Sequence, residues 1–92
     1  MSATDVNLRH FFALSDIADT GRLSTAADRV YMSQSALTQA LRKLEEHAGV
    51  PLFERAGFGV TETEAGSMLV RRSKRAIDLL AQAERELSLI HI

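Results

Sequence analysis

Hydrophobic residues recur at helical spacing in three segments of the N-terminal half of the chain. In residues 7–20 they stand at every third or fourth position. A shorter segment at residues 25–31 follows Ser24, and a third at residues 34–48 follows Ser33, so that each serine is placed to cap a helix. Glycine closes the first and the third segments, as Gly21 and Gly49. The pattern predicts three helices.

The connections between these segments predict how the helices are arranged. Met32 and Ser33 alone separate the second segment from the third, and so short a link imposes the sharp angle of a helix-turn-helix. From Val50 to Glu62 two short extended runs flank the glycine-rich stretch 56–59, the pattern of a β-hairpin or "wing". Thr63 can then cap a last helix that runs to about Leu89.

We therefore expect a mainly α protein with a winged helix-turn-helix, a three-helix core plus a short β-hairpin wing, at residues 1–62. A long dimerisation helix follows at residues 63–92. Its seam has alternating spacings of four and three, as in a two-stranded coiled coil, with Ser73 as its polar position. The alternative is an amphipathic helix folded back on its own core, but this short chain offers little domain to cover it. The predicted dimerisation residues are Leu69, Ala76, Leu80, Ala83, Leu87 and Ile90.

The third predicted helix has two chemically different sides. Its apolar side comprises Leu37, Ala40, Leu41, Leu44 and Ala48, and its polar side comprises Gln34, Ser35, Thr38, Gln39 and Arg42. Amide and hydroxyl groups both donate and accept hydrogen bonds, so they can match the mixed edges of base pairs in a major groove. No acidic residue occurs in residues 33–41.

These chemistries assign roles toward double-stranded DNA. Gln34 and Gln39 can each bind adenine through two hydrogen bonds, and Ser35 and Thr38 are short enough for base edges or phosphates. The cations that would hold the DNA backbone are Arg42, Lys43 and Arg55. An idle polar surface helix is the competing interpretation.

Composition weakens this hypothesis and excludes several others. The net charge is −1, whereas DNA-binding domains are usually basic. Because salt screens surface charges, however, only those within about 10 Å of a phosphate affect its binding strongly. There is no cysteine, the three histidines have no ligand-like spacing, and Glu45-Glu46 and Glu84–Glu86 have the pattern of ordinary exposed helix charge. We expect no metal, no cofactor and no enzymatic activity. No apolar run could span a membrane, so a cytoplasmic location is expected.

Several motifs together resemble the LysR-type transcriptional regulators. They are residues 26–45, Gly49, Leu-Phe-Glu-Arg at 52–55 and Thr-Glu-Ala-Gly at 63–66. The resemblance implies a winged helix-turn-helix, a dimerising linker helix and a larger C-terminal domain that binds a small effector. That last domain is absent from these residues. Because the apolar pattern is unfinished at residues 88–92, we expect a fragment or a truncated product. The resemblance gives Gln34, Ser35, Thr38 and Gln39 the base-facing role, and it gives phosphate or backbone contacts to Ser24, Thr25, Ser33 and Arg55.

One departure from the family pattern lies at the wing tip. Many members carry a basic residue there that enters the minor groove, whereas residues 56–59 supply none and Phe58 stands in that place. A rival hypothesis from another class is a helical protein–protein interaction module without DNA binding, which the near-neutral charge favours. Binding to mixed genomic DNA at low salt separates the two.

Overall fold

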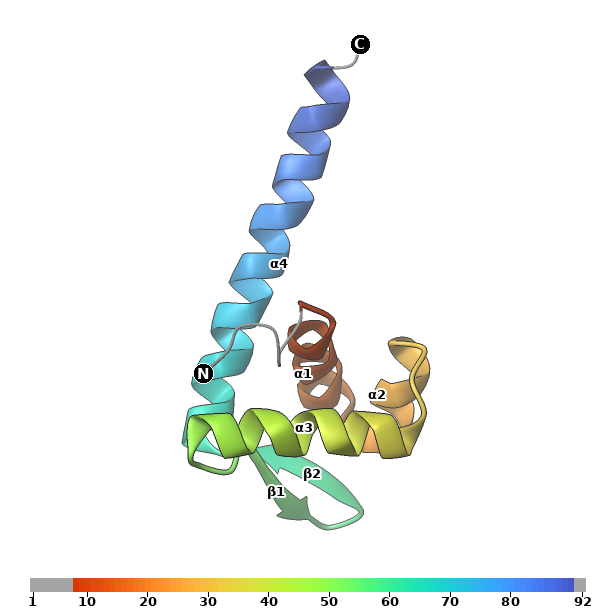
Figure 1. Cartoon of the computed structure of the whole chain (residues 1–92), viewed down its shortest axis with the longest axis vertical. Coiled ribbons are helices and arrows are strands. Elements are labelled where there is room, and N and C mark those ends of the chain that lie inside the picture. Colours follow the sequence, from red (N-terminus) through yellow and green to blue (C-terminus); the bar gives the residue numbers. More distant parts are fainter. Residues whose placement is uncertain (1–7, 91–92) are drawn as a thin grey trace.

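A computed structural model of the protein describes residues 8–90 and contains four helices and one hairpin in that range (Figure 1). The elements are α1 (Leu8–Thr20), α2 (Leu23–Arg29), α3 (Gln34–Ala48), β1 (Phe53–Ala56), β2 (Gly59–Glu62) and α4 (Glu64–Ile90). This order confirms the predicted mainly α, winged helix-turn-helix architecture with a long last helix. The predicted start of the first helix at Asn7, together with His91, lies outside the described residues.

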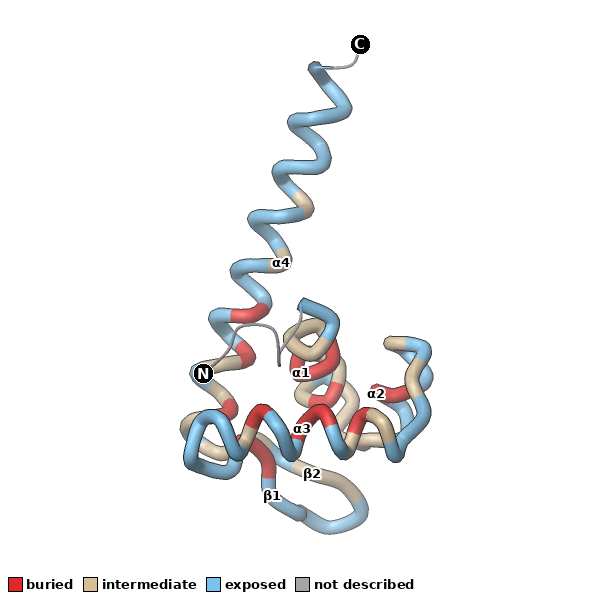
Figure 2. The backbone as a smooth tube through the Cα atoms, viewed as in Figure 1, coloured by how far each residue is buried: buried red, intermediate tan, exposed pale blue. Residues whose placement is uncertain are grey.

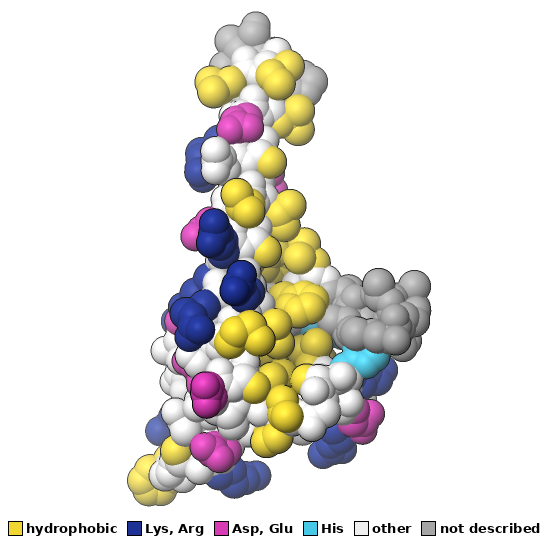
Figure 3. All heavy atoms as spheres, turned by 90° about the vertical axis from the view of Figure 1, so that its left-hand side faces the viewer, with side chains coloured by type: hydrophobic (Ala, Val, Ile, Leu, Met, Phe, Trp, Pro, Cys, Tyr) yellow, Lys and Arg dark blue, Asp and Glu magenta, His cyan; other side chains and the backbone are white. Residues whose placement is uncertain are grey.

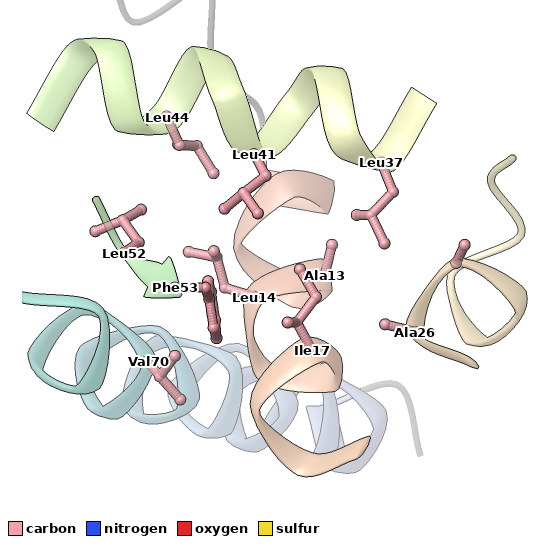
Figure 4. Close-up of a cluster of buried hydrophobic side chains, with 11 residues drawn as sticks. Ala13, Leu14, Ile17, Ala26, Leu37, Leu41, Leu44, Leu52, Phe53 and Val70 are labelled. Atoms are coloured by element: carbon pink, nitrogen blue, oxygen red, sulfur yellow. The ribbon is translucent and has the colours of Figure 1, made fainter. Parts of the chain in front are cut away.

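The core forms where α1 meets the other helices and the base of the hairpin. Leu14 and Ile17 of α1, Leu37 of α3 and Leu52 before β1 are the largest fully buried side chains. Figure 4 shows residues of α1, α3 and β1 pointing toward one another, with Val70 of α4 closing one side. This single cluster fixes α3 and the hairpin relative to α1.

The ends of α3 agree with the prediction. The Ser33 hydroxyl oxygen accepts a hydrogen bond from the backbone N–H of Ala36 at 3.1 Å, and the N–H of Gly49 donates to the carbonyl of Glu45 at 2.9 Å. Only the last predicted inward residue is wrong, because Ala48 is exposed. A helix cap at each end therefore sets where the polar side of α3 begins and stops.

The predicted bounds of the second helix, 25–31, were two residues late at both ends. The helix begins at Leu23, its N-cap is Arg22 without a side-chain cap, and Ser24 lies within the first turn rather than capping it. The Thr20 hydroxyl instead accepts from the N–H of Arg22 at 3.3 Å. At the other end, Tyr31 has a φ of 56°, which ends the helix before that residue.

The hairpin is joined tightly to α4. The strands are antiparallel, with Phe53 opposite Glu62 and Ala56 opposite Gly59. Thr63 caps α4 as predicted: its hydroxyl oxygen accepts from the N–H of Gly66 at 3.0 Å and donates to the carbonyl of Pro51 at 2.7 Å. A side-chain carbon at Gly66 would overlap the carbonyl of Leu52, so only glycine allows this approach.

Most of α4 extends away from the rest of the molecule. Its buried residues are Gly66, Val70 and Ser73, all in its first half, and the upper part of the helix is exposed in Figure 2. The molecule is accordingly elongated, with extents of 49 × 29 × 24 Å. No helix in residues 8–90 combines the length and the apolar character needed to cross a bilayer.

Candidate nucleic-acid interface

The polar side of α3 is accessible and slightly concave. Gln34, Ser35 and Gln39 are exposed and Thr38 is half-buried, while Leu37, Ala40, Leu41 and Leu44 are buried against the body. The four polar residues line one shallow hollow together with Arg42. The structure therefore brings all four predicted base-reading residues onto one open surface, which we call the α3 hollow.

A second hollow connects α3 to the wing. Gln34 contributes to this wing hollow as well, so the two surfaces are continuous. The remaining lining comes from α2 and its N-cap, and from the hairpin: Arg22, Leu23, Ser24, Arg55, Phe58, Gly59 and Val60. Two predicted phosphate or backbone contacts, Ser24 and Arg55, are thus within the same concave surface as the start of α3. Arg22 was not predicted as a contact to DNA. The sequence feature that could have indicated it is a cation directly before the second helix.

The charges bordering these hollows are unpaired cations. Arg22, Arg42 and Arg55 are exposed, and none of the three has a carboxylate partner within residues 8–90. The ion pairs found in that range lie elsewhere: Arg29 to Asp16 at 3.6 Å, and Lys74 to Asp19 at 2.7 Å. Three unpaired arginines therefore border the two hollows, although the chain as a whole carries a net charge of −1.

The other residues predicted to contact the DNA backbone, Thr25, Ser33 and Lys43, lie in different surroundings. Thr25 is exposed on α2, and the hydroxyl of Ser33 can still donate a hydrogen bond while it accepts from Ala36. Lys43 lines neither hollow. It lies near His10 of α1, whose pKa is lowered by burial and then by the positive charges of Lys43 and Arg9. The DNA-backbone role of Lys43 remains a prediction, and its position favours it less than that of Arg42.

The predicted dimerisation seam is divided between the body and solvent. Leu69 packs against the core, and Ser73 is buried with its hydroxyl donating to the carbonyl of Leu69 at 2.8 Å. The rest of the seam is exposed: Ala76, Leu80, Ala83, Leu87 and Ile90. The body therefore covers the start of the seam and leaves its remainder exposed.

Sequence reasoning missed two side chains that hold these elements in place. Glu45 had the pattern of an ordinary exposed charge, yet its carboxylate accepts from the N–H of Leu52 at 2.7 Å and of Phe53 at 3.5 Å. The guanidinium of Arg9 donates to the carbonyls of Val30 and Tyr31, each at 3.1 Å. Glu45 ties α3 to the wing, and Arg9 ties α1 to the turn before α3.

This arrangement, with the capped helix α3, a sharp turn before it and a hairpin beside it, defines a winged helix-turn-helix. Residues 8–67 match the family model of bacterial regulatory helix-turn-helix proteins of the lysR family. The chain belongs to that family, whose members are transcriptional regulators.

Relatives and solved structures agree with this assignment. The chain is 39% identical over 88 residues to the transcriptional regulator MetR of Haemophilus influenzae, covering 96% of this chain and 28% of that protein. A regulator of Azotobacter vinelandii is 34% identical, with 90% of this chain and 58% of that protein covered. The chain thus spans about a quarter of the length of relatives such as MetR and the small neutral protease regulatory protein of Streptomyces coelicolor, 28% and 23% respectively.

Two solved structures share the fold closely. The DNA-binding domain of CbnR in a complex with DNA superimposes with a TM-score of 0.82 at 25% identity, covering 95% of this chain and all of that one. Full-length LysG of Corynebacterium glutamicum with bound arginine also gives a TM-score of 0.82, at 31% identity, covering 90% of this chain and 28% of that chain.

Proposed function

We propose that this chain binds duplex DNA sequence-specifically as the DNA-binding part of a transcription regulator, with no catalytic role. In this proposal α3 lies in the major groove, where Gln34, Ser35, Thr38 and Gln39 contact base edges. Backbone phosphates are held by the hydroxyls of Ser24, Thr25 and Ser33 and by the cations Arg42, Lys43 and Arg55. The boundary between the binding domain, 1–62, and the helix, 63–92, is part of the same proposal.

The observation that carries the proposal is the open α3 hollow, in which amide and hydroxyl side chains lie beside the unpaired Arg42. Amides and hydroxyls can satisfy base edges, while the arginines bordering them can bind phosphate. The complex of the CbnR DNA-binding domain with DNA supports it, since that domain shares this fold over its whole length.

Selection of binding sites from random duplex DNA, followed by anisotropy titration of the selected site, tests the proposal. Gln34→Ala or Gln39→Ala should weaken binding to the selected site by roughly 1–3 kcal/mol and leave binding to mixed DNA almost unchanged. Gln82→Ala is the matched control, because Gln82 is exposed on α4 and far along the chain from α3. Equal losses for Gln39→Ala and Gln82→Ala would refute base reading by Gln39.

Contacts to the DNA backbone should affect the affinity for DNA and its dependence on salt in a different way. Arg55→Ala should weaken all sequences alike and reduce the slope of log affinity against log salt by about one, because one counterion fewer is released. Arg85→Ala removes the same charge from the exposed end of α4 and should leave both affinity and slope near wild type. No binding of the wild type to mixed genomic DNA at low salt would refute the function and favour the protein–protein interaction module.

We further propose that two copies pair through α4. Leu80, Leu87 and Ile90 are 45%, 55% and 79% exposed and recur at coiled-coil spacing, so pairing would remove their apolar surface from water. The seam continues at Ala76 into an apolar hollow between α1 and α4 that includes Leu8 and Phe11. Figure 3 shows hydrophobic side chains in one band from α4 onto the body.

Light scattering on the purified protein tests the pairing. Leu87→Lys and Leu80→Lys should shift the mass from dimer to monomer, because a lysine in the seam would bury an unpaired charge. Gln82→Lys on the same helix is the control, since it adds an equal charge where the side chain reaches Glu86. A monomeric wild type, or dissociation by the control variant alone, would contradict the proposed seam.

A further inference from the structure

The tip of the wing presents one aromatic side chain to solvent. The strands pair up to Ala56 and Gly59, so the turn consists of Gly57 and Phe58 alone. Phe58 is 97% exposed and is the most exposed large hydrophobic residue in residues 8–90. A two-residue hairpin turn favours glycine and short polar residues, and nothing in the turn requires an aromatic ring. The identity of residue 58 therefore calls for a reason outside the hairpin.

The wing is held rigidly enough to fix where Phe58 lies. The N–H of Val60 donates to the carbonyl of Gly21 at 2.9 Å, which joins β2 to the corner between α1 and α2. A side-chain carbon at Gly59 would overlap that same carbonyl, so the two backbones are in direct contact. The backbone of the wing accordingly has a fixed position relative to the body, and Figure 1 shows the turn between β1 and β2 projecting beyond the body.

Phe58 also borders the surface that would meet DNA. It lines the wing hollow together with Gln34, Arg22 and Arg55. With α3 in a major groove, arginines on this side would meet the neighbouring phosphates, and the turn beyond them would meet the adjacent minor groove. A phenylalanine offers about 150–250 Å² of apolar surface but no hydrogen bond, so it can contact only sugars and exposed faces of bases.

We infer that Phe58 enters the minor groove beside the α3 site as an apolar wedge and selects an easily unstacked base step there. This inference rests on the proposed DNA-binding function and adds a specificity residue to it. Apolar side chains that enter a minor groove partly unstack a base step, and pyrimidine–purine steps such as TA resist this least. The wing would then read deformability of the duplex without any cation at its tip.

The test compares wild type, Phe58→Ala and Phe58→Leu on the selected duplex with either a TA step or a stiff A-tract at the flank. Tyr31→Ala is the matched control, because Tyr31 is 90% exposed and lines neither hollow. Phe58→Ala should lose roughly tenfold affinity for the TA duplex and little for the A-tract duplex, with an unchanged salt slope. Phe58→Leu should retain part of the preference, and Tyr31→Ala should match wild type.

A fluorescent base analogue, 2-aminopurine, placed in the flanking step reports unstacking directly. Its fluorescence should rise when wild type binds and should not rise with Phe58→Ala. Equal affinities of wild type and Phe58→Ala for the TA duplex, or binding by wild type without a rise in fluorescence, would overturn the wedge. Failure of wild type to bind any duplex would instead overturn the DNA-binding function, so the two failures are distinguishable. Circular dichroism should show that Phe58→Ala melts as wild type does, because the side chain is exposed.

Discussion

Replacing Glu45 should show how much the contact between α3 and the loop before the wing contributes to stability, separately from the packing of the apolar core. Its carboxylate accepts from the N–H of Leu52 at 2.7 Å, and Leu52 is only 2% exposed. The bond from the N–H of Phe53, at 3.5 Å, is at the limit of hydrogen bonding and adds little. A hydrogen bond to a charged group contributes about 1.5–3 kcal/mol, so Glu45→Ala should lower the free energy of unfolding by about 2 kcal/mol. Glu45→Gln keeps an acceptor without the charge and should lose about half as much.

Urea unfolding followed by circular dichroism measures this loss, at one fixed protein concentration because pairing of copies would change the apparent stability. In a domain of this size a change of about 2 kcal/mol corresponds to a melting temperature lower by about 8–16 °C. Glu46→Ala is the control: Glu46 is exposed, accepts no hydrogen bond from the wing, and should change the stability by less than about 0.5 kcal/mol. The reasoning fails if Glu45→Ala and Glu46→Ala unfold at the same urea concentration.

Two further predictions concern packing and pH. Gly66→Ala should destabilise the protein by about 1–3 kcal/mol, because the added carbon would overlap the Leu52 carbonyl; a melting temperature equal to that of Ser67→Ala would contradict this contact. His10 has a pKa below its usual 6.5, so the unfolded state binds its proton more readily, and stability should fall as pH drops from about 6.5 toward the folded pKa. Unfolding measured across that range should show the decrease in wild type and a weaker one in His10→Gln; equal slopes would disprove the shift.

The fold was predictable where local chemistry decides it. Ser33 and Gly49 bound α3 because a hydroxyl and a left-handed glycine satisfy its terminal backbone groups, and both signals lie within the sequence of the helix ends. Thr63 marks the start of α4 for the same reason. The apolar and polar sides of α3 also follow from spacing alone, which is why the four residues of the α3 hollow were found together.

Contacts between distant segments were not predictable in the same way. The partner of Glu45 is backbone in the loop before β1, and Arg9 binds carbonyls more than twenty residues away, so no local pattern reveals either. The second helix was misplaced because its N-cap is Arg22, which makes no side-chain cap hydrogen bond, so no capping residue marks where the helix begins. The division of the α4 seam at Leu69 and Ser73 likewise depends on how α1 packs, which spacing does not specify.

The near-neutral charge of the chain, the chief argument against DNA binding, loses force once the charges are located. Arg29 and Lys74 are paired with Asp16 and Asp19 of α1, so these cations are neutralised away from α3. Arg22, Arg42 and Arg55 have no carboxylate partner within residues 8–90 and border the two hollows. Since screening limits the effect of a surface charge to about 10 Å, a phosphate beside residues 33–41, which include no acidic residue, would sense the arginines that border the hollows more than the distant carboxylates of α4. Position, rather than net charge, then decides affinity: exchanging Arg42 for glutamate should weaken DNA binding far more than the same exchange at Arg85, although both change the net charge equally.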